Sequence, residues 1–171
     1  MGAKAKDYFI EFNKLAIGSN FFEFVLDNAF FASVEGGEFS NANAVVKLAL
    51  IKSENMYDLQ FNLTGVVGTT CDNCLNEISI PLKNEFHLLM KISENEDYGD
   101  DEIIYITKKI LEYDLTQYLY ESFVLSIPTR KVCEMTNKKC NQELATKINN
   151  FESEDYGDGS NPMWDKLKGI F

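Results

Sequence analysis

The sequence contains few of the residues on which enzymes and nucleic-acid readers depend. Of its 171 residues, one is a histidine, His87, and one is an arginine, Arg130. It has no Ser-His-Asp pattern, no His-Glu-x-x-His motif and no glycine-rich phosphate loop. Arginine is preferred for bidentate contacts to phosphate, and a net charge of −11 disfavours broad binding to a nucleic-acid backbone. We therefore expect a protein that is not an enzyme and has no small-molecule substrate.

Proline and long apolar runs are also scarce. Three prolines and a hydrophobic fraction of 45% indicate a folded chain rather than a disordered one. No run approaches the roughly 18 apolar residues of a membrane span, and residues 1–20 lack the apolar stretch of a secretory signal. We expect a cytoplasmic protein without membrane contact, in which cysteines stay free or bind metal rather than form disulfides.

Four cysteines form two pairs that lie far apart in the sequence. Cys71 and Cys74 make a C-x2-C hook after a predicted strand, and Cys133 and Cys140 follow a predicted helix. Two such pairs offer one zinc ion four soft ligands in a closed structural site, so zinc is the cofactor that we favour. Two alternatives stay open. The thiols are free, or the hook is the redox motif of a thiol oxidoreductase, which would open a helix where residues 75–80 read as β-strand.

The first two thirds of the chain read mostly as strands. Apolar residues predict short strands over 21–26, 44–51, 57–67, 85–92 and 103–106. A turn at residues 53–55 joins the second strand to the third as a hairpin. Gly65 and Gly68 permit either a bulge or the close approach of another backbone, and Pro81 precedes the strand over 85–92. The polar segment 93–102 carries six acids and reads as a solvated loop.

The clearest helix begins at Asp114, where Gln117 completes a capping box, and ends at Pro128. Its apolar face consists of Leu115, Tyr118, Leu119 and Phe123. We predict an α+β fold, an antiparallel β-sheet or partly open β-barrel with one main helix and a C-terminal helix. Residues 1–150 form a single domain with a zinc-stapled loop, 151–160 an acidic linker, and 161–171 an amphipathic helix.

One cationic cluster surrounds the second cysteine pair. Its members are Arg130, Lys131, Lys138 and Lys139. If the protein contacts RNA or an acidic partner, we expect the contact in this loop, because the rest of the chain is acidic. The alternative is that these bases only balance neighbouring thiolates and acids.

The C-terminal segment has an apolar side. Asn161 can cap a helix and Pro162 suits its first turn. The apolar residues beyond them are Trp164, Leu167, Ile170 and Phe171. Such a helix either docks in a partner's groove or folds back onto its own domain. We mark it as a candidate partner-docking tail, with folding back as the alternative.

Several segments share their order and spacing with one protein family. They are residues 63–67, 71–75, 114–115, Glu121, 125–128, Cys133 and 161–167. Together they resemble the YceD-like family, the large ribosomal RNA subunit accumulation proteins. Members of that family carry a similar sequence of a glycine, a β segment and a C-x2-C-Leu hook. The resemblance spans residues 15–171. Asn161 and Met163 depart from the family pattern, which has Asp and Arg at these places.

The resemblance implies support of large-subunit ribosomal RNA accumulation and implies no catalytic activity. The partners that it implies are ribosomal proteins, assembly factors or large-subunit rRNA. Since an acidic surface suits a basic protein partner, we expect an acidic adaptor of ribosome assembly. The alternative from another class is a protein-interaction module unrelated to ribosomes.

Overall fold

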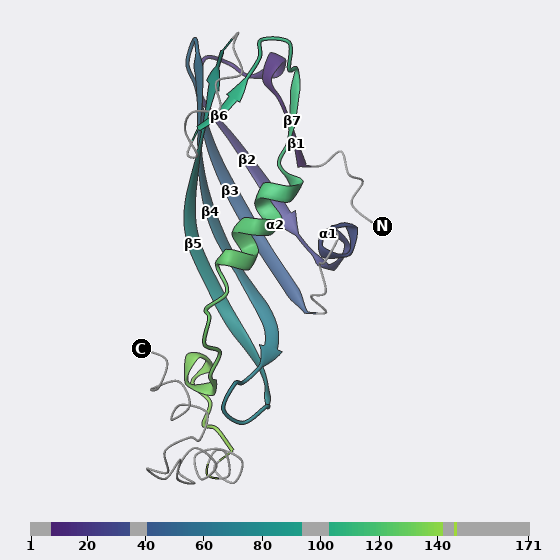
Figure 1. Cartoon of the computed structure of the whole chain (residues 1–171), viewed down its shortest axis with the longest axis vertical. Helices are drawn as coiled ribbons and strands as arrows, with labels where there is room; N and C mark the ends of the chain where they lie inside the picture. Colours follow the sequence, from purple (N-terminus) through teal and green to yellow (C-terminus); the bar gives the residue numbers. More distant parts are fainter. Residues whose placement is uncertain (1–7, 35–40, 94–102, 142–145, 147–171) are drawn as a thin grey trace, which may run out of the picture.

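A computed structural model describes residues 8–34, 41–93, 103–141 and 146 of the chain (Figure 1). The main sheet has the order β2 (Gly18–Leu26), β3 (Ala42–Lys52), β4 (Met56–Thr70), β5 (Glu77–Ile92) and β6 (Ile103–Ile106). A second, two-stranded sheet pairs β1 (Phe9–Glu11) with β7 (Glu112–Asp114). The helices are η2 (Phe12–Lys14), α1 (Asn28–Ser33), α2 (Thr116–Leu125) and η3 (Cys133–Thr136). The predicted α+β class is confirmed.

The hairpin of β3 and β4 forms where the sequence predicts it. Ser53 donates its backbone N–H to the carbonyl of Met56 at 2.8 Å, which closes the turn. Gly65 lies opposite Ala44, and a Cβ added at Gly65 would meet the Ala44 Cβ at 2.5 Å. The close approach predicted at this glycine is therefore present, and a larger residue would push the two strands apart.

The main sheet is open and mixed rather than closed or purely antiparallel. Pairs β2–β3, β3–β4 and β4–β5 are antiparallel, but β6 runs parallel to β5. The prediction of an antiparallel sheet is wrong for β6, because β6 starts beside Leu89 and runs in the same direction as the last four residues of β5. The alternative of a barrel is wrong too, since β2 and β6 form the two edges.

Strand β5 runs without a break through Pro81, which is paired with Val66 of β4. The prediction of two separate β segments, 75–80 and 85–92, is therefore wrong, because a single strand covers Glu77–Ile92. Proline lacks a backbone N–H and is tolerated where a strand has one unpaired edge. In the described part of the chain β6 pairs only with Leu89–Ile92, so Pro81 lies on such an edge.

Helix α2 covers one face of the sheet and contributes to a single core (Figure 1). Leu115, Leu119 and Phe123 are fully buried, which confirms the predicted apolar face. The ring centroid of Phe123 lies 4.6 Å from that of Phe31 in α1. Tyr118 donates from its hydroxyl to the His87 carbonyl at 2.9 Å, which ties α2 to β5.

The start of α2 differs from the predicted capping box. The N-cap of α2 is Leu115 and not Asp114, and it makes no side-chain capping hydrogen bond. The Asp114 carboxylate, one residue earlier, accepts from the backbone N–H of Thr116 at 2.8 Å. The Gln117 amide, however, donates to Glu121 at 2.7 Å, one turn further on, instead of reaching back. That i, i+4 pair satisfies Gln117 on the exposed side of the helix.

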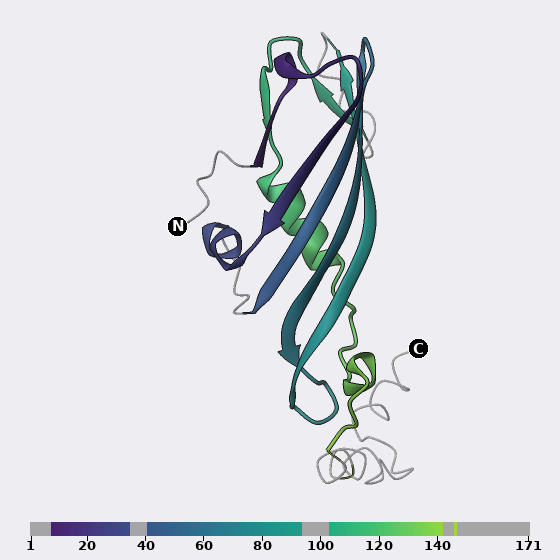
Figure 2. The ribbon, with the colours of Figure 1, turned by 180° about the vertical axis from the view of Figure 1, so that it is seen from behind.

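The opposite face of the sheet is bare of helices in the described chain (Figure 2). Side chains along each strand alternate between the buried face and this outer face. The acidic segment 94–102, the linker 151–160 and the tail 161–171 lie outside the described residues, so their predictions stay predictions. None of the described helices is both long and apolar enough to cross a bilayer.

Candidate metal centre

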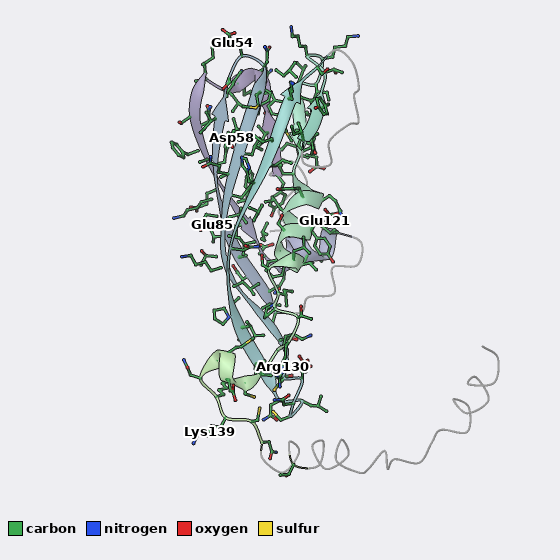
Figure 3. All side chains as sticks on the ribbon, turned by 60° about the vertical axis from the view of Figure 1, so that its left-hand side comes forward. Glu54, Asp58, Glu85, Glu121, Arg130 and Lys139 are labelled. Atoms are coloured by element: carbon green, nitrogen blue, oxygen red, sulfur yellow. The ribbon has the colours of Figure 1, made fainter. Side chains whose placement is uncertain are left out.

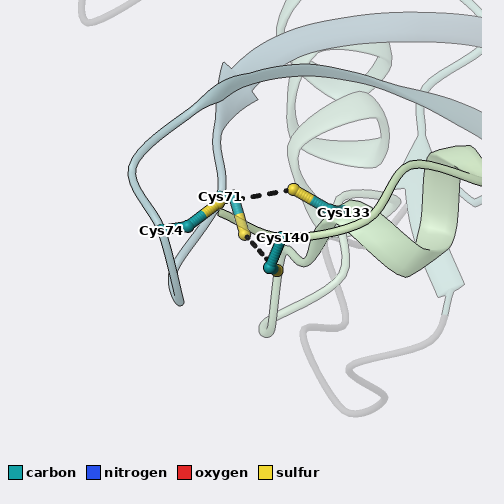
Figure 4. A group of neighbouring side chains, drawn as sticks. All are labelled: Cys71, Cys74, Cys133 and Cys140. Atoms are coloured by element: carbon teal, nitrogen blue, oxygen red, sulfur yellow. Dashed lines mark hydrogen bonds between the residues drawn. The ribbon is translucent and has the colours of Figure 1, made fainter. Parts of the chain in front are cut away.

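The side chains of the four cysteines come together (Figure 4) at the end of the sheet where β4 leads into β5. Cys71 and Cys74 follow β4, Cys133 opens η3, and Cys140 lies just beyond it. All four Sγ atoms lie within 4.8 Å of one another. The two pairs that the sequence separates are therefore adjacent in space, as predicted.

The sulfur spacing suits a metal ion. Sγ of Cys71 lies 3.7 Å from Sγ of Cys140, and Sγ of Cys74 lies 3.5 Å from Sγ of Cys133. A tetrahedral zinc ion about 2.3 Å from each sulfur would separate the sulfurs by about 3.8 Å. Three of the cysteines are buried and Cys140 is partly exposed. The donor set and its spacing thus fit a closed four-sulfur site.

The first hook is shaped by a backbone reversal. Leu75 has a φ of 58°, the left-handed conformation that non-glycine residues adopt at a cost. This reversal lets Leu75 donate its N–H to the Cys71 carbonyl at 2.9 Å, while Cys71 donates to the Asn76 carbonyl at 2.8 Å. The two hydrogen bonds close the hook before β5 begins.

The second pair is held by a similar device. Asn137 has a φ of 55° and ends η3; asparagine tolerates this conformation better than most residues. Lys138 then donates its N–H to the Cys133 carbonyl at 3.1 Å, and the Thr136 hydroxyl donates to the same oxygen at 2.9 Å. The looser C-x6-C spacing is therefore compacted by a short 3-10 helix that brings Cys140 back toward Cys133.

The thiols differ in acidity because their surroundings differ. Burial alone would raise the pKa of Cys71, but backbone N–H groups of Asn73 and Cys74, with Cys133, lower that pKa to about 6. Burial, together with hydrogen bonds to the other thiols, raises the pKa of Cys133 to about 12. Metal ligands must be thiolates, so the backbone of the hook already favours the ligand form at Cys71.

A carboxylate that the sequence did not single out joins the two halves. Asp72 donates its backbone N–H to the Lys131 carbonyl at 2.7 Å, and its carboxylate accepts from the Lys131 N–H at 2.6 Å. The Lys131 ammonium lies 4.0 Å from the same carboxylate. The only signal in the sequence was the position of Asp72 between two cysteines. This reciprocal bridge aligns the hook with the loop that precedes Cys133.

The basic loop lies at the same end of the molecule, as Figure 3 shows for Arg130 and Lys139. Arg130, Lys138 and Lys139 are exposed, and Lys131 is half-buried against Asp72. Lys138 also borders a polar recess of about 350 Å³. The other residues of that recess include Asn41, Thr69, Thr70 and Ser79. The structure therefore groups the four predicted bases around the cysteines, with one of them engaged by an acid.

A family comparison covers the part of the chain that contains this site. The family model described as the large ribosomal RNA subunit accumulation protein YceD matches residues 59–171. The chain belongs to the YceD family. The YceD match begins at Leu59, later than the resemblance from residue 15 that the motifs suggest, and includes all four cysteines and α2. Among curated proteins and among solved structures, no match was found.

Proposed function

We propose that this YceD-family protein is a non-enzymatic factor that supports accumulation of large-subunit ribosomal RNA. It would act by binding a ribosomal protein, an assembly factor or the rRNA itself. The family description names this process. The observation that carries the binding role is the grouping of four bases around a cysteine cluster in an otherwise acidic protein.

The proposed cofactor is a structural zinc ion held by Cys71, Cys74, Cys133 and Cys140. Zinc bound by four thiolates has no open coordination position, so it would stabilise the fold rather than activate a substrate. The protein's own part is to hold the four sulfurs together through the hook, η3 and the Asp72–Lys131 bridge. The free-thiol alternative is less consistent with four sulfurs gathered at tetrahedral spacing.

The thiol oxidoreductase alternative is disfavoured by the backbone immediately after the hook. A redox C-x-x-C opens a helix, whose N-terminus stabilises the nucleophilic thiolate. After Cys74 the chain instead turns through Leu75 and enters β5 at Glu77. An insulin-reduction assay that compares the wild type with Cys74→Ser tests this alternative directly; activity lost in the variant would revive it.

The basic loop is the proposed contact to RNA. Residues 130–139 contain four bases and one acid, Glu134, whereas the whole chain has a net charge of −11. An exposed cluster of this kind can neutralise phosphates locally while the acidic remainder repels nonspecific contacts. The acidic remainder in turn suits a basic partner such as a ribosomal protein.

The test is affinity capture from native lysate, with subsequent analysis of RNA and protein. We expect large-subunit rRNA, ribosomal proteins or precursor particles with the wild type. The variant Lys138→Gln/Lys139→Gln should recover less RNA, and the salt slope of purified rRNA binding should fall by about two. The matched control is Lys108→Gln/Lys109→Gln, which removes two adjacent exposed lysines elsewhere. No ribosomal component in any capture would refute the proposal.

A further inference from the structure

The outer face of the sheet carries a groove. No described helix covers this face of the sheet (Figure 2). Its volume is about 920 Å³. Two rows of outward side chains cross it from β2 to β5. One row consists of Phe21, Ala49, Gln60 and His87, and the next of Glu23, Lys47, Asn62 and Glu85.

The groove has an apolar end and a polar end. Phe21 is 76% exposed on the edge strand β2, and Ala49 lies beside it on β3. On β5, His87 contacts the Asp58 carboxylate at 2.6 Å, and Glu85 accepts from the Asn62 amide at 2.9 Å. The apolar end of the groove thus borders hydrogen-bonded polar groups, the arrangement of centre and rim that docking surfaces have.

We propose that this groove is occupied by residues 161–171 of the same chain. That segment carries the apolar side chains Trp164, Leu167, Ile170 and Phe171, whose spacing places them along one side of a helix. Packed against Phe21 and Ala49, the segment would cover the exposed ring. This inference is independent of the ribosomal role.

Charge favours the same occupant. The groove presents two acids, Glu23 and Glu85, against a single lysine, Lys47. The segment 161–171 carries Lys166 and Lys168 against one acid, Asp165. A cationic helix on an acidic rim is attracted, whereas a second copy of this face would set acid against acid.

The connecting chain is long enough to reach the groove. The groove row that contains Phe21 lies ten residues along β5 from Glu77, next to the cysteine end, and Phe21 is three strands away from β5. At about 3.3 Å per residue and about 4.8 Å per strand, the distance from Glu77 to Phe21 is about 36 Å. The 20 residues from Asn141 to Asn161 can span at most about 66–72 Å. A tether that can span its two sites raises the effective concentration of the attached segment, which favours the chain's own tail over a free partner.

Trp164 is the only tryptophan of the chain, so its fluorescence in the full-length protein reports the proposed contact directly. We expect a blue-shifted emission that does not change with protein concentration. Phe21→Asp should move the emission to longer wavelength and increase quenching by acrylamide. Leu125→Asp is the matched control, since Leu125 is 81% exposed on α2 and outside the groove. Far-UV circular dichroism verifies that both variants remain folded.

Each other outcome overturns the proposal. A wild-type emission typical of indole in water would show that the tail is not packed. A blue shift that disappears on dilution would identify a second copy as the occupant. A blue shift that survives Phe21→Asp in the folded variant would place Trp164 against another surface. Capture of rRNA or ribosomal proteins can succeed or fail in any of these cases, so the two proposals are tested separately.

Discussion

The two ends of this protein are stabilised by different means. The sheet and α2 bury large apolar side chains such as Leu59, Phe31 and Phe123 completely. Beyond Thr70, the last residue of β4, the hook and loop leave Leu75 68% exposed and Met135 41% exposed. What they bury instead is cysteine, while solvent-exposed hydrogen bonds between Asp72 and Lys131 join the hook to the loop. One end is thus packed by large apolar side chains and the other by four neighbouring thiols, and the variants below test whether the second end depends on a bound metal ion.

The largest expected effect is on the packed end. Phe123→Ala removes a ring that is fully buried between α2 and α1, so the free energy of unfolding should fall by about 3–5 kcal/mol. Urea denaturation monitored by circular dichroism measures it. Leu125→Ala on the same helix, 81% exposed, should change stability by no more than about 0.5 kcal/mol. An equal loss of unfolding free energy in both variants would show that this end of the protein is not stabilised by the buried side chains.

Loss of metal should affect the other end alone. We expect elemental analysis to find one zinc per chain, lost in Cys71→Ser and in Cys140→Ser and retained in Met135→Ser. On chelation, hydrogen exchange should accelerate in residues 71–76 and 131–140 while β3, β4 and α2 keep their protection. Zinc that persists in either cysteine variant would show that the four thiols do not form one site.

A smaller effect is expected from the bridge between the hook and the loop. Asp72→Ala removes the acceptor of the Lys131 N–H, so zinc affinity in a chelator competition should fall about 10- to 100-fold. Asp72→Asn, which keeps an oxygen acceptor, should restore part of the affinity. Glu134→Gln removes a nearby acid without touching the bridge and serves as the control for charge. An Asp72→Ala affinity equal to the wild type would remove any positioning role from Asp72.

The smallest effect concerns the backbone of the hook. Leu75→Gly relieves the left-handed conformation, which is worth about 1 kcal/mol, so zinc affinity should rise a few-fold. Asn137→Gly at the other positive-φ position should have little effect, because asparagine already tolerates it. A loss of affinity in Leu75→Gly would mean that the leucine side chain, not its backbone, supports the hook.

Local patterns were sufficient to predict some features. The apolar face of α2, the β3–β4 turn and the pairing of Cys71 and Cys74 with Cys133 and Cys140 depend on periodicity, turn residues and ligand type, all of which are visible in the sequence. The α+β class is predicted by the same patterns. The candidate metal centre was therefore predictable as a set of ligands.

Other features depend on contacts between distant residues. Pro81 is accepted inside β5 only because no described strand pairs there on its other side, which the sequence around Pro81 does not reveal. The parallel direction of β6 depends on the path of the chain between strands. The role of Asp72 depends on Lys131, which lies on a separate loop. The candidate ligands were therefore predictable from the sequence, whereas the bridging role of Asp72 was not.

Strand β5 sets the separation between the two ends of the sheet. It starts at Glu77, next to the cysteine hook, passes the groove at Glu85 and His87, and ends at Ile92 beside β6. Sixteen residues of continuous strand extend about 50 Å. A ligand bound at the cysteine end would therefore be held about 50 Å from one bound beside β6.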